Sequence, residues 1–212
     1  MSEINDKSSN INTKEKIVKI ALKLFLKNGF YNVSMQNVAD EIGISKPAIY
    51  HHFKNKDMMV EAVLDYFSET MGAWSKEYFK RCKSDIKQFL KKSFGAIYIY
   101  KNVEKILLKD EDNINSLKYT YNEFLLTISK YSDKYKDRIS HDTMRYRTVS
   151  ESVFKKGQER GIINSNYSPV NLAMMNHSMI EGMSFIAEVD SSIDVKKESK
   201  KLFEIFWEMI SS

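Results

Sequence analysis

The densest concentration of residues with possible binding chemistry lies in residues 43–59, which read GISKPAIYHHFKNKDMM. Ile49 and Phe53 are four positions apart, so on a helix they share one face and point into a core. The lysine, tyrosine and histidine side chains between and beside them would then face outward. Such groups suit contacts with phosphates and base edges of DNA. The stretch therefore predicts the second, recognition helix of a helix-turn-helix motif.

Local signals place the two helices of this motif. Ser34 begins a short helical pattern, and Gly43 ends it, because glycine can take the positive φ that a sharp turn requires. Ser45 is a good N-cap for the next helix, and Pro47 suits its first turn, where a missing N–H leaves no bond unmade. We expect the recognition helix to span residues 46–52.

The exposed positions of the recognition helix have different predicted roles. Lys46 can donate to a guanine or a phosphate, and Ala48 can contact a thymine methyl group. Tyr50 and His51 carry hydrogen-bonding tips on short stems, which favours positioning over base reading.

Residues at helix starts complete the candidate interface, because a hydroxyl, an ammonium and free backbone N–H groups converge there on anions. The predicted DNA-binding residues are Ser34, Ser45, Lys46, Pro47, Ala48, Tyr50, His51, Lys54 and Lys56.

The elements around the motif are predicted to be helices. The pattern predicts a first helix from Thr13 to Asn28, and with residues 34–54 it would form a three-helix domain at 13–54. Such a domain is small, so we expect it to rest on a further helix from Asn55 toward Tyr78. Residues 1–12 are polar and are predicted to be a disordered arm.

The whole chain is predicted to be all-α, with a larger helical ligand-binding and dimerisation domain at 55–212. Only seven Gly and two Pro occur in 212 residues, without the alternating patterns of strands. Further helices are expected near 84–100, 102–109, 112–136, 141–160, 169–188 and 194–210.

Charge and composition favour a polyanionic partner. The net charge is +5, and residues 1–56 hold nine Lys against five Asp and Glu, which is +4 of that excess. A single cysteine, Cys82, cannot form an internal disulfide, and neither a membrane-length apolar run nor a signal peptide is apparent. We expect a cytoplasmic protein without membrane contact.

Catalysis and metal binding are not expected. His51 and His52 are adjacent and diverge on a helix, while His141 and His177 are isolated. We predict no catalytic residues, no metal and no cofactor.

Residues 13–66 resemble the N-terminal domain of the TetR family of bacterial transcriptional regulators. The segments IALKLFLKNGF, VADEIGIS, KPAIYHHF and KNKDMM carry the resemblance. It implies an all-helical homodimer, a palindromic operator in double-stranded DNA and a small-molecule effector bound by the C-terminal domain. It also implies DNA-backbone contacts at Tyr50, His51 and Lys56. Ala48 departs from the pattern, since many members carry Thr there.

Aromatic and methionine residues in the C-terminal part suggest an apolar effector cavity, although most of them are expected to be core. The predicted cavity residues are Tyr98, Tyr121, Phe124, Phe154 and Met179.

Two apolar stripes on the last helices predict a four-helix dimer interface. The predicted interface residues are Leu172, Met175, Met179, Gly182, Met183, Ile186, Leu202, Phe203, Phe206, Met209 and Ile210.

The sequence therefore predicts a ligand-responsive regulator, with repression as the expected sign. The alternative is a helical small-molecule-binding or scaffolding protein that has lost DNA binding.

Overall fold

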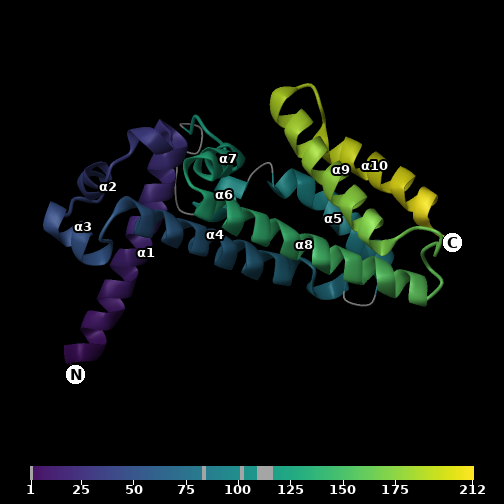
Figure 1. The fold of residues 1–212 in the computed structure, drawn as a ribbon, viewed down its shortest axis with the longest axis horizontal. Helices are drawn as coiled ribbons and strands as arrows, with labels where there is room; N and C mark the ends of the chain where they lie inside the picture. The colour runs from purple at the N-terminus through teal and green to yellow at the C-terminus, as the bar shows by residue number, and fades with distance from the viewer. Residues whose placement is uncertain (1, 83–84, 101–102, 109–116) are drawn as a thin grey trace. The chain divides into compact units, whose positions relative to one another are not determined.

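The computed structural model describes residues 2–82, 85–100, 103–108 and 117–212, and leaves the side chains of 2–12, 81 and 98–100 undescribed. Within these residues the chain is helical and has no β-strand, which confirms the all-α prediction. The elements in chain order are α1 (Ser2–Asn28), η1 (Phe30–Asn32), α2 (Met35–Ile42), α3 (Lys46–His52), α4 (Lys56–Tyr78), η2 (Lys80–Cys82), α5 (Ile86–Tyr100), α6 (Val103–Leu107), α7 (Tyr121–Tyr131), α8 (Asp133–Glu159), α9 (Pro169–Val189) and α10 (Val195–Ile210) (Figure 1).

The chain folds as two compact units. The first unit comprises Met1–Trp74 and Glu104–Tyr135, and the second comprises Ser75–Val103 and Lys136–Ser212. The unit that holds the predicted helix-turn-helix therefore extends past residue 54 and includes most of α4 together with α6 and α7. Both α4 and α8 continue from one unit into the other.

The core of the first unit is the one expected for a three-helix motif. Ile17 and Phe25 of α1 are buried, as are Ile49 and Phe53 at the two ends of the predicted inward face. Figure 1 shows α1, α2 and α3 as the purple and blue helices at the N-terminal part of the chain. The expected boundaries at Asn28, Ile42 and His52 are confirmed.

The start of α1 differs from the prediction. The helix begins at Ser2 rather than at Thr13, so residues 2–12 continue it instead of forming a disordered arm. Residues 2–28 contain neither Gly nor Pro, so nothing in this segment interrupts the helix.

Helix α7 belongs to the core of the first unit. The backbone N–H groups of Lys118 and Tyr119 donate to the Leu26 carbonyl at 3.0 and 2.9 Å. The Phe124 ring stacks on Phe25 with centroids 5.4 Å apart. The N-terminal motif is thus completed by a segment about a hundred residues further along the chain.

Helix boundaries between residues 112 and 160 also differ from those expected. Thr120 caps α7, and Glu123 returns the bond to the Thr120 N–H at 2.7 Å, so this helix starts at Tyr121 rather than near 112. Helix α8 begins at Asp133 and runs unbroken to Glu159, whereas a break was expected between 136 and 141. The first part of the predicted 112–136 helix, residues 112–116, lies outside the described residues.

The core of the second unit forms where α9 and α10 both pack on α5. Phe94 lies 5.9 Å from Phe203 and 5.6 Å from Phe206, measured between ring centroids. The chain's end is joined to this unit by an Asn164 N–H that donates to the Ile210 carbonyl at 2.8 Å. No helix among the described residues has the length and apolar character needed to span a membrane.

Candidate nucleic-acid interface

A reciprocal cap fixes the start of α2. The Ser34 hydroxyl accepts from the Asn37 N–H at 3.2 Å, and the Asn37 side-chain oxygen accepts from the Ser34 N–H at 2.8 Å. Together these bonds satisfy two N–H groups that a helix N-terminus otherwise leaves without a partner. Gly43 ends the helix at φ 80°, in the left-handed region that a residue with Cβ enters at a cost.

The start of α3 is built in a similar way. The Ser45 hydroxyl accepts from the Ala48 N–H at 3.4 Å, and Pro47 lies in the first turn. Ile49 is fully buried and Phe53 is nearly so, which fixes the rotation of the helix about its axis. The side chains on the opposite face are therefore held in solvent.

The structure brings most of the predicted DNA-binding residues together on one local segment. Tyr50 is 42 % exposed, and Ala48 is half-buried on the flank of the helix. The remaining exposed members are Ser34, Ser45, Lys46, Pro47, His51 and Lys54. This face combines basic groups, hydrogen-bonding tips and the amino ends of two helices, a set that suits phosphate and base-edge contacts.

Lys56 is the exception among these residues. Its Nζ donates to the Phe30 carbonyl at 2.6 Å and lies 3.9 Å from the centroid of the Phe30 ring. Burial lowers the pKa of this ammonium, while the Asp57 carboxylate raises it. The Lys56 side chain is thus half-buried within the first unit.

Sequence reasoning missed a basic residue from α1. The Nζ of Lys14 lies 5.5 Å from the centroid of the Phe53 ring, at the end of α3. Burial, followed by the charges of His51 and Lys14, lowers the pKa of His52. Only its place in a lysine-rich segment could have singled out Lys14, because 39 residues separate it from Phe53.

The predicted effector residues lie in two separate cores. Tyr121 stacks on Phe67 with centroids 4.1 Å apart, and Phe124 packs on Phe25, all within the first unit. Phe154 is buried in the second unit, and Met179 is partly buried against the same core. The side chain of Tyr98 lies outside the described residues. The four described residues are therefore divided between two cores.

The predicted dimer residues divide into buried and exposed groups. Leu172, Phe203, Phe206 and Ile210 were predicted to lie in the dimer interface, but they are buried in the core of the second unit. Their physical role is to pack α9 and α10 onto α5. Met175, Ile186 and Met209 are exposed, while Met179, Gly182, Met183 and Leu202 are half-buried.

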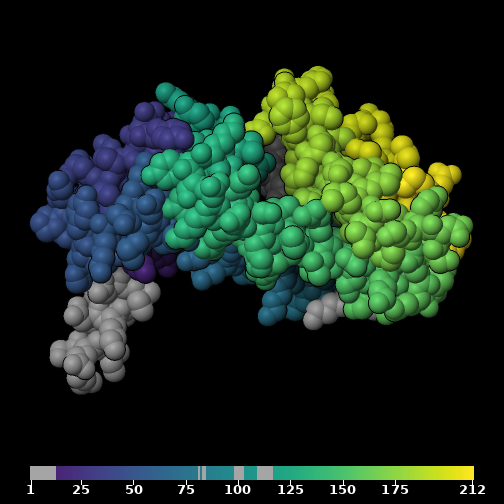
Figure 2. Space-filling view, viewed as in Figure 1, coloured from purple at the N-terminus to yellow at the C-terminus, as the bar shows by residue number. Residues whose placement is uncertain are grey.

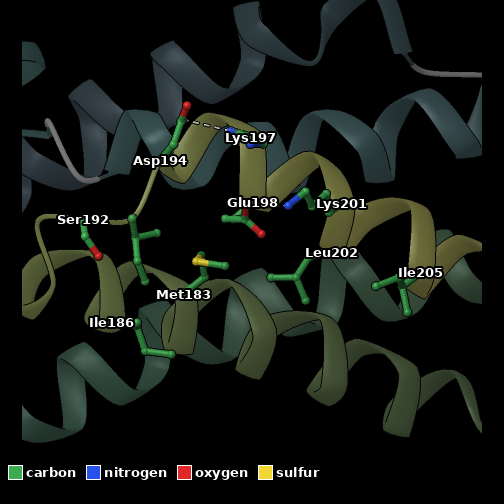
Figure 3. Close-up of a pocket in the computed structure, with 10 residues that line it drawn as sticks. Met183, Ile186, Ser192, Asp194, Lys197, Glu198, Lys201, Leu202 and Ile205 are labelled. Carbon is green, nitrogen blue, oxygen red and sulfur yellow. Dashed lines mark hydrogen bonds and ion pairs between the residues drawn. The ribbon is translucent and has the colours of Figure 1, made fainter.

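A groove lies between α9 and α10. It has a volume of about 550 Å³, and its lining is mostly apolar. Its lining includes Met183 and Ile186 of α9, Leu202 and Ile205 of α10, and the charged side chains of Glu198 and Lys201 (Figure 3). The side chains of α9 also form part of the outer surface of the second unit, in yellow-green in Figure 2.

Metal chemistry has no support in the described part of the chain. No group of three or more His, Cys, Asp or Glu residues there lies close enough to hold a metal ion. Cys82 is buried and free.

The fold and the interface define a helix-turn-helix protein with an appended helical unit. Residues 17–63 match the sequence model of the family described as bacterial regulatory proteins, tetR family. This match covers the helix-turn-helix and the helices on either side of it, so the N-terminal part of the chain carries the sequence pattern of the TetR family.

Individual comparisons extend this similarity beyond the motif. The chain is 26% identical over 198 residues to the HTH-type transcriptional regulator YerO of Bacillus subtilis, a match that covers 90% of this chain and 62% of YerO. It is 27% identical over 157 residues to the HTH-type transcriptional regulator QacR of Staphylococcus aureus, which covers 71% of this chain and 73% of QacR. The chain thus spans less than two thirds of YerO.

A solved structure shares the fold over nearly the whole chain. This is a transcriptional regulator from Saccharomonospora viridis in complex with choline, with a TM-score of 0.70 and 17% sequence identity. The likeness covers 95% of this chain and 98% of that chain. At this identity the likeness concerns the fold alone.

Proposed function

We propose that this protein is a DNA-binding transcriptional regulator that reads double-stranded DNA through α3. The observation that carries the proposal is the division of α3 into a buried face at Ile49 and an exposed face at Lys46, Tyr50 and His51. Recognition helices of this kind lie in the major groove, with their N-terminal residues at base edges. The match of residues 17–63 to the TetR family model supports the same role.

The test is binding of the purified chain to a random-sequence duplex at several salt concentrations. Each phosphate neutralised by a lysine steepens the fall of log affinity with log salt by about 0.9. We expect a salt-dependent shift that Lys46→Met and Lys54→Met each weaken. The matched control is Lys130→Met, which removes an exposed lysine of α7 and should leave binding unchanged.

The rival function predicts a different result. A helical small-molecule-binding or scaffolding protein that has lost DNA binding would show no shift at low salt. That outcome would refute the proposed function.

We further propose a homodimer formed by α9 and α10, which a palindromic operator requires. Phe185 and Ile205 expose 66% and 65% of their surfaces, more apolar area than an isolated surface needs. A Cβ placed on Gly182 would meet nothing within 4 Å in this chain, so internal packing does not explain this helical glycine. A second copy that approaches closely at Gly182 does explain it.

Charge supports this pairing. Helix α9 carries Glu181 and Glu188 and no Lys or Arg, whereas residues 195–201 at the start of α10 hold four Lys against one Glu. Across a two-fold axis the acidic α9 of one copy can face the lysine-rich start of α10 of the other.

Sedimentation decides the dimer proposal. We expect Phe185→Glu combined with Ile205→Glu to yield a folded monomer, because both side chains are exposed in the single chain and the new charges repel each other across the interface. The control is Leu126→Glu, a similarly exposed apolar position on α7 at 62%. A double variant that stays dimeric would overturn the assignment of this face.

We also propose that a small molecule controls DNA binding. The Saccharomonospora viridis regulator was solved in complex with choline, and its fold is shared over nearly the whole of this chain. Differential affinity for two states is required, because a ligand that binds both equally shifts nothing.

Native mass spectrometry of the purified chain tests this idea. We expect a bound compound that is released on denaturation and that, when added back, lowers DNA affinity by roughly 5- to 150-fold. A retained compound without effect on DNA affinity would argue against control by that ligand.

A further inference from the structure

Lys56 is the first residue of α4, and its ammonium is directed into the first unit. Its Nζ donates to the Phe30 carbonyl at 2.6 Å. The same atom lies 3.9 Å from the centroid of the Phe30 ring and 5.5 Å from that of Phe25. Hydrogen bonds from a charged donor are stronger than neutral ones, and a ring face adds a cation–π contribution. Three contacts of one ammonium therefore converge on one place.

The bond partner of Lys56 lies just before α2. Phe30 begins η1, which ends at Asn32 and is followed by Ser34, the N-cap of α2. Lys56 itself follows Asn55, whose side-chain oxygen caps α4 by accepting from the Met58 N–H at 2.9 Å. One side chain thus joins the approach to α2 with the start of α4, the two helices that flank α3 in sequence.

This connection ties the segment that leads into α2 to the N-terminus of α4. Free N–H groups at such ends are suited to phosphates, and their spacing must match the phosphates of a duplex. An ammonium that left Phe30 to contact a phosphate would abandon the carbonyl and both rings. Lys54 lies two residues earlier in the chain and is exposed. Its ammonium is therefore free to contact a phosphate, which makes Lys54 a suitable comparison for Lys56.

We propose that Lys56 is a positioning residue for DNA binding, which holds the N-termini of α2 and α4 in register through the Phe30 carbonyl and ring rather than neutralising a phosphate. The inference rests on the proposed DNA-binding function and changes the role expected for this lysine from the sequence.

The experiment measures affinity of the full chain for a random-sequence duplex over a range of KCl concentrations, at a temperature well below unfolding. Lys56→Met keeps the apolar stem and removes the ammonium. We expect it to lower affinity about tenfold at every salt concentration, with an unchanged slope of log affinity against log salt. Lys56→Arg retains a charged donor and should restore most of the affinity.

Lys54→Met is the matched comparison. It should lower the slope by about 0.9, which is the signature of one lost phosphate contact. The two variants remove the same charge from positions two residues apart, so net charge cannot explain a difference between them.

Two results would overturn the inference while leaving the proposed function intact. A slope reduced by Lys56→Met as much as by Lys54→Met would make Lys56 a phosphate contact. A lower thermal stability with unchanged affinity of the folded chain would make its role structural only. Absence of binding by the unaltered chain would instead refute the DNA-binding function together with the inference.

A second variant covers the case in which Lys56→Met does not fold. Lys56→Gln keeps a neutral donor that can point toward the Phe30 carbonyl and removes the charge. Its slope should equal that of the unaltered chain, and a slope lower by about 0.9 would contradict the positioning role.

Discussion

The two units present opposite kinds of surface at the places where we propose that they bind partners. On α3 itself the exposed side chains are polar or basic apart from the ring of Tyr50, and Ile49 and Phe53 face the core. On α9 and α10 the exposed side chains include Phe185, Val189 and Ile205. A polar face suits a partner that is itself charged and hydrated, whereas an apolar face is stable only when it is covered.

The units also differ in how their functional faces are built. The candidate DNA interface lies within residues 34–56, so local caps and one glycine turn position almost all of it. The α9–α10 face depends on which side of each helix packs on α5, a helix about a hundred residues earlier. Local signals are therefore informative for the first face and weak for the second.

The largest expected effect is the difference in stability between substitutions at a buried and at an exposed position of α10. Phe206→Ala should lower the free energy of unfolding by about 3–5 kcal/mol, because it removes a ring buried against Phe94 and Phe154. Its neighbour Ile205 is 65% exposed, so Ile205→Ala should lower stability only by weakening the dimer. Urea unfolding at two protein concentrations checks this. If Ile205→Ala lowered the free energy of unfolding equally at both protein concentrations, the assignment of Ile205 to the dimer interface would be contradicted.

The next effect concerns base reading by α3. Lys46→Ala should change the preference among base pairs by about 1–3 kcal/mol, because a side chain at the start of the helix can reach a base edge. Tyr50→Ala should weaken specific and random DNA alike, since its hydroxyl is expected to contact the backbone. Selection from a randomised duplex library measures both. If Tyr50→Ala changed the base preference and left the nonspecific affinity intact, Tyr50 would be a base-reading residue and its assignment as a backbone contact would be wrong.

A smaller effect tests the cap that positions α2. Ser34→Ala should lower the stability of the first unit by about 1 kcal/mol, because the Asn37 N–H loses its acceptor. Ser129→Ala is the control. Its hydroxyl donates to the Leu126 carbonyl within α7 and caps nothing, so a change within about 0.5 kcal/mol is expected. Thermal unfolding measures both variants, and an equal loss of stability in the two would show that the cap contributes little.

The smallest expected effect is a pH dependence of folding stability that arises from His52. Its pKa in the folded chain is lowered by burial and by the charges of His51 and Lys14, so the unfolded chain binds this proton more tightly. Stability contributed by the neutral imidazole is thus present above the ordinary pKa of about 6.5 and is lost as pH falls through that value. His52→Gln should flatten the stability profile between pH 7 and pH 5. If His52→Gln left the profile of stability against pH unchanged, other titratable groups would be responsible for the pH dependence.

The prediction of the DNA-binding motif succeeded because its signals are local. Ser34, Gly43, Ser45 and Pro47 each act on the backbone within a few residues, and the structure has the expected helix boundaries there. The buried positions Ile49 and Phe53 follow from helical spacing alone.

Predictions failed where a contact between distant segments decides the outcome. Phe203 and Phe206 read as members of an apolar stripe, but spacing cannot tell a stripe that faces α5 from one that faces a partner. The predicted cavity residues Tyr121 and Phe154 share a chemical character, and the fold places them in different cores.

The amino-acid sequence by itself determined the all-α class, the helix-turn-helix and the polarity of its exposed face, because caps, turns and helical periodicity act over a few residues. Tertiary structure decided that α7 completes the N-terminal core through Leu26 and Phe25, and which apolar side chains of α10 remain at the surface. It also decided the environment of Lys56, whose ammonium meets a carbonyl 26 residues earlier in the chain. Such contacts depend on how helices pack, and no local pattern encodes that packing.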